Sequence, residues 1–114
     1  MRLLKAVRGA LDAYGESLST PYNFTLTVTA PGPFGYQQLY LAEMNQYVDF
    51  WNPMAYDYAG PWSRVTTNQA NLFASLTSPA STPFNTKAIV EYYISQGILP
   101  AKIVLGMPLY GRCV

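Results

Sequence analysis

The 114-residue sequence contains no histidine and only one cysteine, Cys113. Without histidine the chain can build neither a Ser-His-Asp triad nor a His-containing zinc site, and a lone cysteine cannot form an internal disulfide. Charged residues are also scarce, at 11% with a formal net charge of +1. The sequence therefore lacks the electrostatic footprint of a protein that binds nucleic acid or an anionic membrane. We expect no metal, no cofactor, no nucleic-acid or membrane partner and no specific protein partner, so acid–base chemistry must use carboxylates and phenols.

Long apolar runs are absent as well. No stretch approaches the roughly 20 apolar residues of a membrane-spanning helix. Lys5 and Arg8 interrupt the apolar start MRLLKAVRGA before a signal-peptide core can form. Half of the residues are nevertheless hydrophobic, which is typical of a globular chain rather than a disordered linker. We expect one small globular unit without a signal peptide in this chain.

The most informative stretch is 47–58, YVDFWNPMAYDY, whose side chains alternate in character with a period of two. This period predicts a buried strand over 48–56. One face would carry Val48, Phe50, Asn52, Met54 and Tyr56, and the other Asp49, Trp51, Pro53 and Ala55. Asp57 follows where the strand ends, and a carboxylate beside a phenol at the carboxyl end of an apolar strand is where α/β folds place active groups. Pro53 removes a backbone donor from the sheet and predicts a bend.

The rest of the chain alternates between helical and strand periodicities, as successive βα units do. The predicted elements are a helix over 3–18 that ends between 15 and 20, a strand over 24–30, a helix over 36–46, a helix from the capping residue Thr86 to Gly97, and a strand over 103–109. The apolar side of the helix over 36–46 would be formed by Leu39, Tyr40, Met44 and, directly after it, Tyr47. Because strand, helix and strand make one βαβ unit, strands 24–30 and 48–56 should be parallel and open on the same side.

The segment 59–85 is rich in Ser, Thr, Asn and Pro. It is longer than ordinary connections in a compact domain, so it predicts a functional loop that carries a short helix. Residues 68–72 are expected to order this loop.

Two further short motifs have both a functional and a structural interpretation. Asp12 and Glu16 lie one turn apart on the first helix, and we interpret them as a solvated face rather than a paired-carboxylate site. Asn23-Phe24-Thr25 is a glycosylation sequon if the chain is part of a secreted protein. It lies at a strand start, where a glycan must clear the neighbouring helices, so both interpretations of Asn23 stay open.

Two segments resemble glycoside hydrolase family 18 chitinases, and their sequences are most similar to those of fungal members. Residues 49–58, DFWNPMAYDY, resemble the sixth-strand motif with its core Met-x-Tyr-Asp, and residues 102–112, KIVLGMPLYGR, resemble the seventh strand. The resemblance implies an α/β fold that is part of a TIM (β/α)8 barrel, in which 1–114 is a partial catalytic domain lacking strands one to four and strand eight. The family's acidic signature, Asp-x-x-Asp-x-Asp-x-Glu, would lie before Met1. Cys113-Val114 departs from the aromatic-containing ending usual after Gly-Arg.

The resemblance also implies a reaction and a set of site residues. The parent protein would be extracellular and would hydrolyse chitin or chitooligosaccharides, which are β-1,4-linked N-acetylglucosamine polymers, with retention. The substrate's acetamido oxygen would be the nucleophile, and the proton-donating Glu would lie outside this chain. Supporting catalytic roles fall to Tyr56, which would bond the acetamido oxygen, and to Asp57, which would bond a sugar hydroxyl and bias the protonation of the acid Glu. The substrate-binding residues would be Met54, Trp62, Tyr110 and Arg112, although Trp62 could equally hold its loop against the barrel rim.

Three functional interpretations stay open. The chain could belong to a chitinase, to a chitin-binding lectin of the same fold in which the acid is replaced, or to an inactive fragment. The residue at the position of the acid Glu distinguishes the first two. We expect the chain alone to be inactive, because it has no positioned proton donor.

Overall fold

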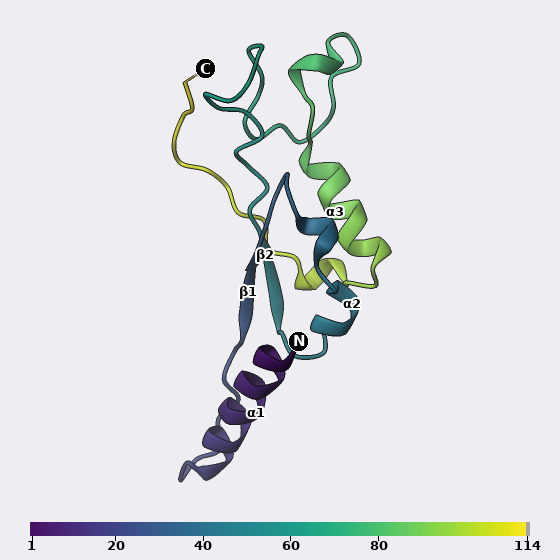
Figure 1. Ribbon diagram of the computed structural model, residues 1–114. Helices are drawn as coiled ribbons and strands as arrows, with labels where there is room; N and C mark the ends of the chain where they lie inside the picture. Colours follow the sequence, from purple (N-terminus) through teal and green to yellow (C-terminus); the bar gives the residue numbers. More distant parts are fainter. Residues whose placement is uncertain (114) are drawn as a thin grey trace.

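The computed structural model describes residues 1–113 (Figure 1). Its elements are α1 (Arg2–Ser17), β1 (Thr27–Ala30), the 3₁₀ helix η1 (Tyr36–Gln38), α2 (Leu41–Met44), β2 (Phe50–Pro53), the 3₁₀ helix η2 (Pro79–Ser81), α3 (Thr86–Ser95) and the 3₁₀ helix η3 (Pro100–Lys102). Val114, part of the unusual ending, lies outside the described residues. None of the helices that the structure describes is long and apolar enough to cross a bilayer.

β1 and β2 pair in parallel, as the βαβ prediction requires. Thr27 lies opposite Phe50 and Ala30 opposite Pro53. The chain at 103–106 runs along the other edge of β2, where the Val104 N–H donates to the Trp51 carbonyl at 2.8 Å. Three parallel segments therefore lie side by side with β2 in the centre.

Pro53 explains why β2 ends early and why the segment over 103–109 is not a regular strand. Gly106 N–H donates to the Pro53 carbonyl at 3.1 Å, but Pro53 has no N–H with which to return a ladder bond. The prediction of a regular strand over 103–109 is therefore wrong, and only an isolated bridge between Trp51 and Ile103 forms. β2 also ends at Pro53, because the Ala55 N–H turns back to the Pro53 carbonyl at 2.9 Å. The bend predicted at Pro53 is confirmed.

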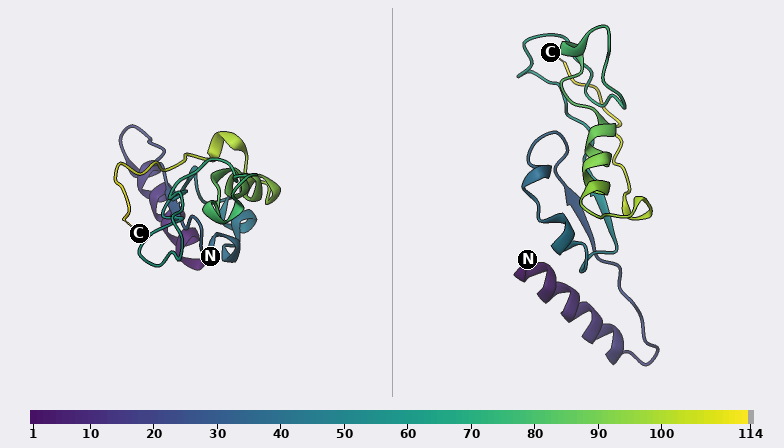
Figure 2. Two further views of the ribbon diagram at one scale, coloured as in Figure 1. Left: turned by 90° about the horizontal axis from the view of Figure 1, so that it is seen from above. Right: turned by 90° about the vertical axis from the view of Figure 1, so that its right-hand side faces the viewer.

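The hydrophobic core lies between the sheet and the helices α2 and α3, which cover the same face of the sheet (Figures 1 and 2). Burial alternates along β2 and beyond, so that Trp51, Pro53 and Ala55 are buried while Asn52 and Met54 are half-buried. The predicted faces are thus confirmed over 50–55. They are wrong at the start of the stretch, where Val48 is buried in the same core as Trp51 and Asp49 is exposed. The largest fully buried side chains are Trp51, Tyr58, Tyr93, Leu41, Ile89, Ile98 and Pro53.

Two helix predictions need correction. The helix predicted over 36–46 is only η1 followed by the single turn α2, because Leu39 between them is extended, with φ −80° and ψ 135°. This extended residue turns Leu41 into the core, while Tyr40 stays exposed. The cap of α3 is Asn85 rather than Thr86, since the Asn85 Oδ1 accepts from Ala88 N–H at 2.9 Å. Gly97, at φ 83°, ends this helix as predicted.

Helix α1 extends away from the core and makes the molecule elongated, at 58 × 28 × 23 Å (Figure 2). It ends at Ser17, within the predicted range. Arg8 bonds Asp12 on the same helix and Asp49 at the start of β2, so Asp12 belongs to an exposed ion pair. Leu3 and Tyr14, two apolar residues of this helix, are exposed.

Candidate active site

All three parallel segments end at the same side of the sheet, and their exits form the candidate site. The loop after β1, the chain after β2 and the tail after residue 106 meet there, together with the loop 59–85 (Figure 1). A pocket of about 360 Å³ opens between the first two exits. It is lined by Pro31, Gly32, Pro33, Phe34, Met54, Tyr56, Asp57 and Trp62. Four of the six predicted site residues therefore line one cavity.

Asp57 binds the other two predicted site residues. The Arg112 guanidinium donates from Nε to Asp57 Oδ1 at 2.8 Å and from Nη2 to Oδ2 at 2.5 Å, which is a bidentate ion pair. The Tyr110 hydroxyl donates to the same Oδ1 at 2.7 Å. Asp57 has a left-handed backbone, with φ 59°, the only non-glycine positive φ among the described residues. Such a conformation is uncommon and occurs often at functional sites.

These contacts decide the ionisation of the site. The hydrogen bond from Arg112 lowers the pKa of Asp57, partial burial opposes this change, and the bond from Tyr110 adds to the lowering. The same hydrogen bond to Asp57 raises the pKa of Tyr110, and the bond to the carboxylate raises the pKa of Arg112. Asp57 is therefore a carboxylate, Tyr110 a neutral phenol and Arg112 a cation over the whole neutral range.

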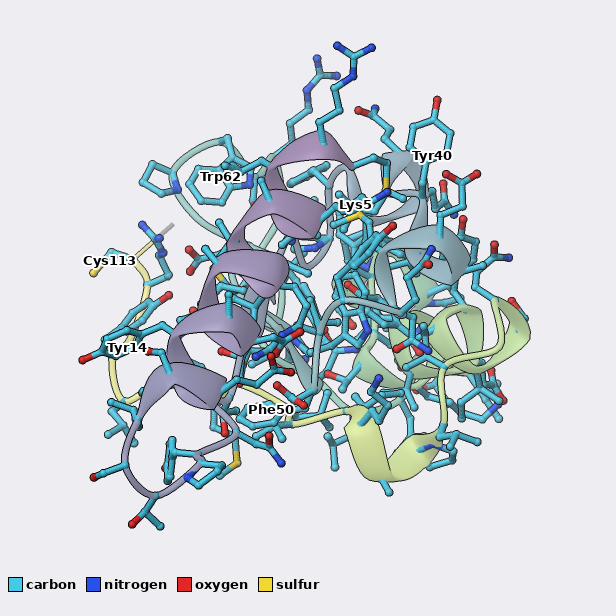
Figure 3. All side chains as sticks on the ribbon, turned by 90° about the horizontal axis from the view of Figure 1, so that it is seen from below. Lys5, Tyr14, Tyr40, Phe50, Trp62 and Cys113 are labelled. Atoms are coloured by element: carbon cyan, nitrogen blue, oxygen red, sulfur yellow. The ribbon has the colours of Figure 1, made fainter. Side chains whose placement is uncertain are left out.

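Aromatic rings surround this ion pair. The Arg112 guanidinium carbon lies 5.4 Å from the centre of the Trp62 ring and 5.5 Å from that of Tyr110. Tyr56 meets Tyr110 edge to face, with ring centres 6.3 Å apart. Trp62 is 54% exposed, and Figure 3 shows it at the periphery of the molecule. The ring thus contacts Arg112 with one part and leaves another open to a ligand.

The loop 59–85 is tied to the site through amide side chains. The Gln69 side-chain amide donates to the Tyr110 carbonyl at 2.6 Å, and the backbone carbonyl of Gln69 accepts from Tyr58 N–H at 2.9 Å. The Asn71 amide donates to the carbonyls of Phe73 and Phe84 at 2.9 and 2.8 Å. The predicted ordering role of 68–72 is confirmed, as is the short helix of this loop, η2. The contact of Gln69 with Tyr110 was missed, because nothing in a sequence shows which distant carbonyl is free.

The loop after β1 contributes residues that the sequence did not indicate as site residues. In this loop Phe34 is 60% exposed and lines the pocket. Gly32 lies against the exit of β2, so that a Cβ there would be 1.7 Å from the Met54 carbonyl oxygen. The useful signal was positional, since this loop leaves the carboxyl end of a strand that is parallel to β2.

Comparison with known proteins identifies the family. The sequence profile of the family described as glycosyl hydrolases family 18 matches residues 1–114 of this chain. The chain belongs to this family. Two fungal relatives are Chitinase 1 of Aphanocladium album, 47% identical over 111 residues, and Endochitinase 1 of Metarhizium robertsii, 45% identical over 111 residues. Each alignment covers 96% of this chain and 26% of the relative.

A solved structure has a similar fold. The Group IV chitinase of Ostrinia furnacalis superposes with a TM-score of 0.76 at 31% identity, covering 94% of this chain and 28% of that one. The expected resemblance and the expected fold class, part of a (β/α)8 barrel with parallel strands, are confirmed. The family 18 chain described here spans about a quarter of the length of the curated relatives that it matches.

Proposed function

We propose that the protein carrying this chain is an extracellular chitinase that hydrolyses β-1,4-linked N-acetylglucosamine polymers. In this proposal, residues 1–114 are a partial family 18 domain that provides barrel strands five to seven. The observation that carries the proposal is the joining of Asp57, Tyr110 and Arg112 at the strand ends of a chain that matches the family throughout.

The contacts suggest how each residue acts. Tyr56 lines the pocket and would donate its hydroxyl hydrogen to the acetamido oxygen of the bound sugar, which holds that oxygen for attack on the anomeric carbon. The attack would form an oxazolinium ion as the leaving oxygen takes a proton from a Glu outside this chain, and water would then open the ring. Tyr56 would also support the charge that develops on the acetamido group.

Asp57 would accept a bond from a sugar hydroxyl and bias the protonation of the acid Glu. A carboxylate offers about four acceptor positions, and Tyr110 and Arg112 occupy three of them. One position on Oδ2 remains for the substrate. An Asp57 that is ionised at neutral pH would favour the protonated form of a neighbouring carboxyl group, which is the form that a general acid requires.

Met54, Trp62, Tyr110 and Arg112 would bind the substrate. Met54 and Phe34 provide apolar surface in the pocket, and the exposed part of the Trp62 ring offers a flat face for a sugar. A pocket lined mainly by apolar and aromatic side chains with a few convergent polar groups is typical of small-ligand sites.

The test uses the longer protein that contains this chain. We expect it to hydrolyse chitooligosaccharides and to release a product whose anomeric configuration is that of the substrate, as followed by NMR. Cello-oligosaccharides have the same linkage but no acetamido group, so they are the matched control and should not be cleaved.

Binding of chitooligosaccharide without hydrolysis would instead identify the lectin of the same fold. The 114-residue chain alone should release nothing above the buffer blank, since general acid catalysis contributes about 10²- to 10⁴-fold and these residues contain no match to the acidic signature. Cleavage by the isolated chain would contradict the roles assigned to its residues.

A further inference from the structure

The turn between α1 and β1 carries the only Asn-x-Ser/Thr sequon in the 114 residues, Asn23-Phe24-Thr25. Asn23 and Thr25 are both exposed, and they lie outside regular secondary structure. The folded surface must accommodate a bulky, polar glycan, so exposure of both sequon side chains is the first requirement.

The backbone on either side of Asn23 is held in place. Tyr22 N–H donates to the Gly15 carbonyl at 3.2 Å. Gly15 is buried, and a Cβ at this position would be 2.0 Å from the Tyr22 carbonyl oxygen. The turn therefore packs directly on α1, and Asn23 stays on the surface of this packed turn.

An exposed aromatic cluster flanks the sequon. The Phe24 ring centre lies 5.7 Å from that of Tyr14 and 4.9 Å from that of Tyr22. Tyr14 and Tyr22 are each 59% exposed, and Figure 3 shows Tyr14 at the outer edge of the molecule. The cluster forms an apolar surface of the kind that a bulky polar group can shield from other chains.

The turn also lies at the opposite end of the sheet from the candidate site. β1 begins close to this turn and ends at Ala30, directly before the pocket loop that contains Gly32 (Figures 1 and 2). A large group on Asn23 would therefore clear the pocket.

We propose that Asn23 is the attachment site of an N-linked glycan whose first sugar lies against the Tyr22 and Tyr14 rings. Asn23 Nδ2 would form a bond to the anomeric carbon of an oligosaccharide carried on a lipid diphosphate. The bond from that carbon to the diphosphate oxygen breaks, the lipid diphosphate leaves, and one amide hydrogen is lost as a proton to a base. The inference rests on the secretory route that the proposed function implies.

The 114-residue chain can be tested directly behind a signal sequence in a yeast secretory host, because the transfer acts on an extended sequon during translocation. We expect the secreted chain to carry a mass increment that peptide N-glycosidase removes, leaving Asp in place of Asn23. Asn23→Gln and Thr25→Ala should abolish the increment, and Thr25→Ser, which keeps the hydroxyl, should retain it. The same chain without the signal sequence should be unmodified.

An unmodified Asn23 in the secreted chain, or an increment that persists in Asn23→Gln, would overturn the proposal. The readout is a mass, so it is separate from the hydrolysis that tests the proposed function. In the longer protein, Asn23→Gln should leave chitooligosaccharide hydrolysis unchanged, because the turn is remote from the pocket. A loss of turnover in a folded Asn23→Gln variant would contradict the placement of the glycan away from the site.

Discussion

The two faces of the stretch 50–57 differ in what covers them. Trp51 and Ala55, on one face, are 0% and 4% exposed and lie in the core beside α3. Met54 and Tyr56, on the other face, are half-buried and line the pocket. One short segment thus contributes one face to the core and the other to the pocket of the candidate site, because successive strand side chains point to opposite faces.

Substitutions on the two faces should therefore have different effects. A change on the core face should be measured as lost stability with the site geometry intact in the surviving folded fraction. A change on the site face should be measured as lost turnover in a protein of nearly normal stability.

Trp51→Ala should destabilise the fold most. The Trp51 ring packs edge to face on Tyr93, with centres 5.9 Å apart, and its indole N–H donates to Asn45 Oδ1 at 3.2 Å. Truncating a buried aromatic residue typically costs about 3 to 5 kcal/mol, a large part of the about 5 to 15 kcal/mol that stabilises a domain. Urea titration followed by far-UV circular dichroism measures the loss.

The matched control is Phe50→Ala, one residue away on the other face and half-buried in this chain. Its cost should be clearly smaller, because fewer contacts are lost. Equal losses at Trp51 and Phe50 would show that both faces contribute equally to the core.

Tyr56→Phe should chiefly lower kcat of the longer protein. Removing one hydroxyl that acts in the transition state typically costs about 2 to 4 kcal/mol and lowers kcat and kcat/KM together. Initial rates over a range of chitooligosaccharide concentrations separate the two parameters. A raised KM with unchanged kcat would make Tyr56 only a binding contact.

Tyr58→Phe is the control for the loss of a phenol hydroxyl in the same segment. Tyr58 is 2% exposed and its hydroxyl pairs with Thr86 Oγ1 at 2.9 Å. This change should lower the free energy of unfolding by about 1 kcal/mol and leave kcat unchanged. A large kcat loss at Tyr58 would break the separation of the two faces.

Arg112→Ala should move the acidic limb of the pH–rate profile to higher pH. Arg112 lowers the pKa of Asp57, so in the native protein Asp57 stays ionised below its usual titration range near 4. The ionised Asp57 stabilises the fold fully at pH values above its pKa in the unfolded chain. This stabilisation is lost as the pH falls through the lower pKa that Asp57 has in the folded chain.

Arg112→Lys keeps the positive charge but not the bidentate geometry, so it should give a smaller displacement of the same sign. The ion pair is partly exposed, so the change in stability itself should be small. An unchanged acidic limb in Arg112→Ala would show that the ionisation of Asp57 does not limit the reaction.

Gln69→Ala should have the smallest effect of the series. Its amide holds the Tyr110 carbonyl, and losing one neutral hydrogen bond costs about 1 kcal/mol. We expect a decrease in kcat/KM of up to about tenfold and a small rise of the acidic limb, because Tyr110 and Arg112 would bind Asp57 less regularly. Thr67→Ala, in the same loop, is the control and should leave the pH profile unchanged.

The sequence by itself determined the local patterns. The period of two at 47–58, the βαβ order and the position of Asp57 after a buried strand were all readable, because they depend on residues close in the chain. The family motifs added Tyr110 and Arg112 as site residues. The bend at Pro53 was predictable for the same local reason, since proline carries no N–H.

Only the tertiary structure decided which distant groups meet. The pairing of Asp57 with Arg112, the bond from Gln69 to the Tyr110 carbonyl and the place of Phe34 in the pocket join segments that are far apart in the sequence. Likewise, the missing N–H of Pro53 interrupts a ladder only because the second edge of β2 faces 103–106, and this neighbour cannot be inferred from the sequence around Pro53. The physical reason is that such contacts depend on the direction of each backbone turn, as at Asp57 with its φ of 59°, and on which backbone groups the neighbouring segments leave unpaired.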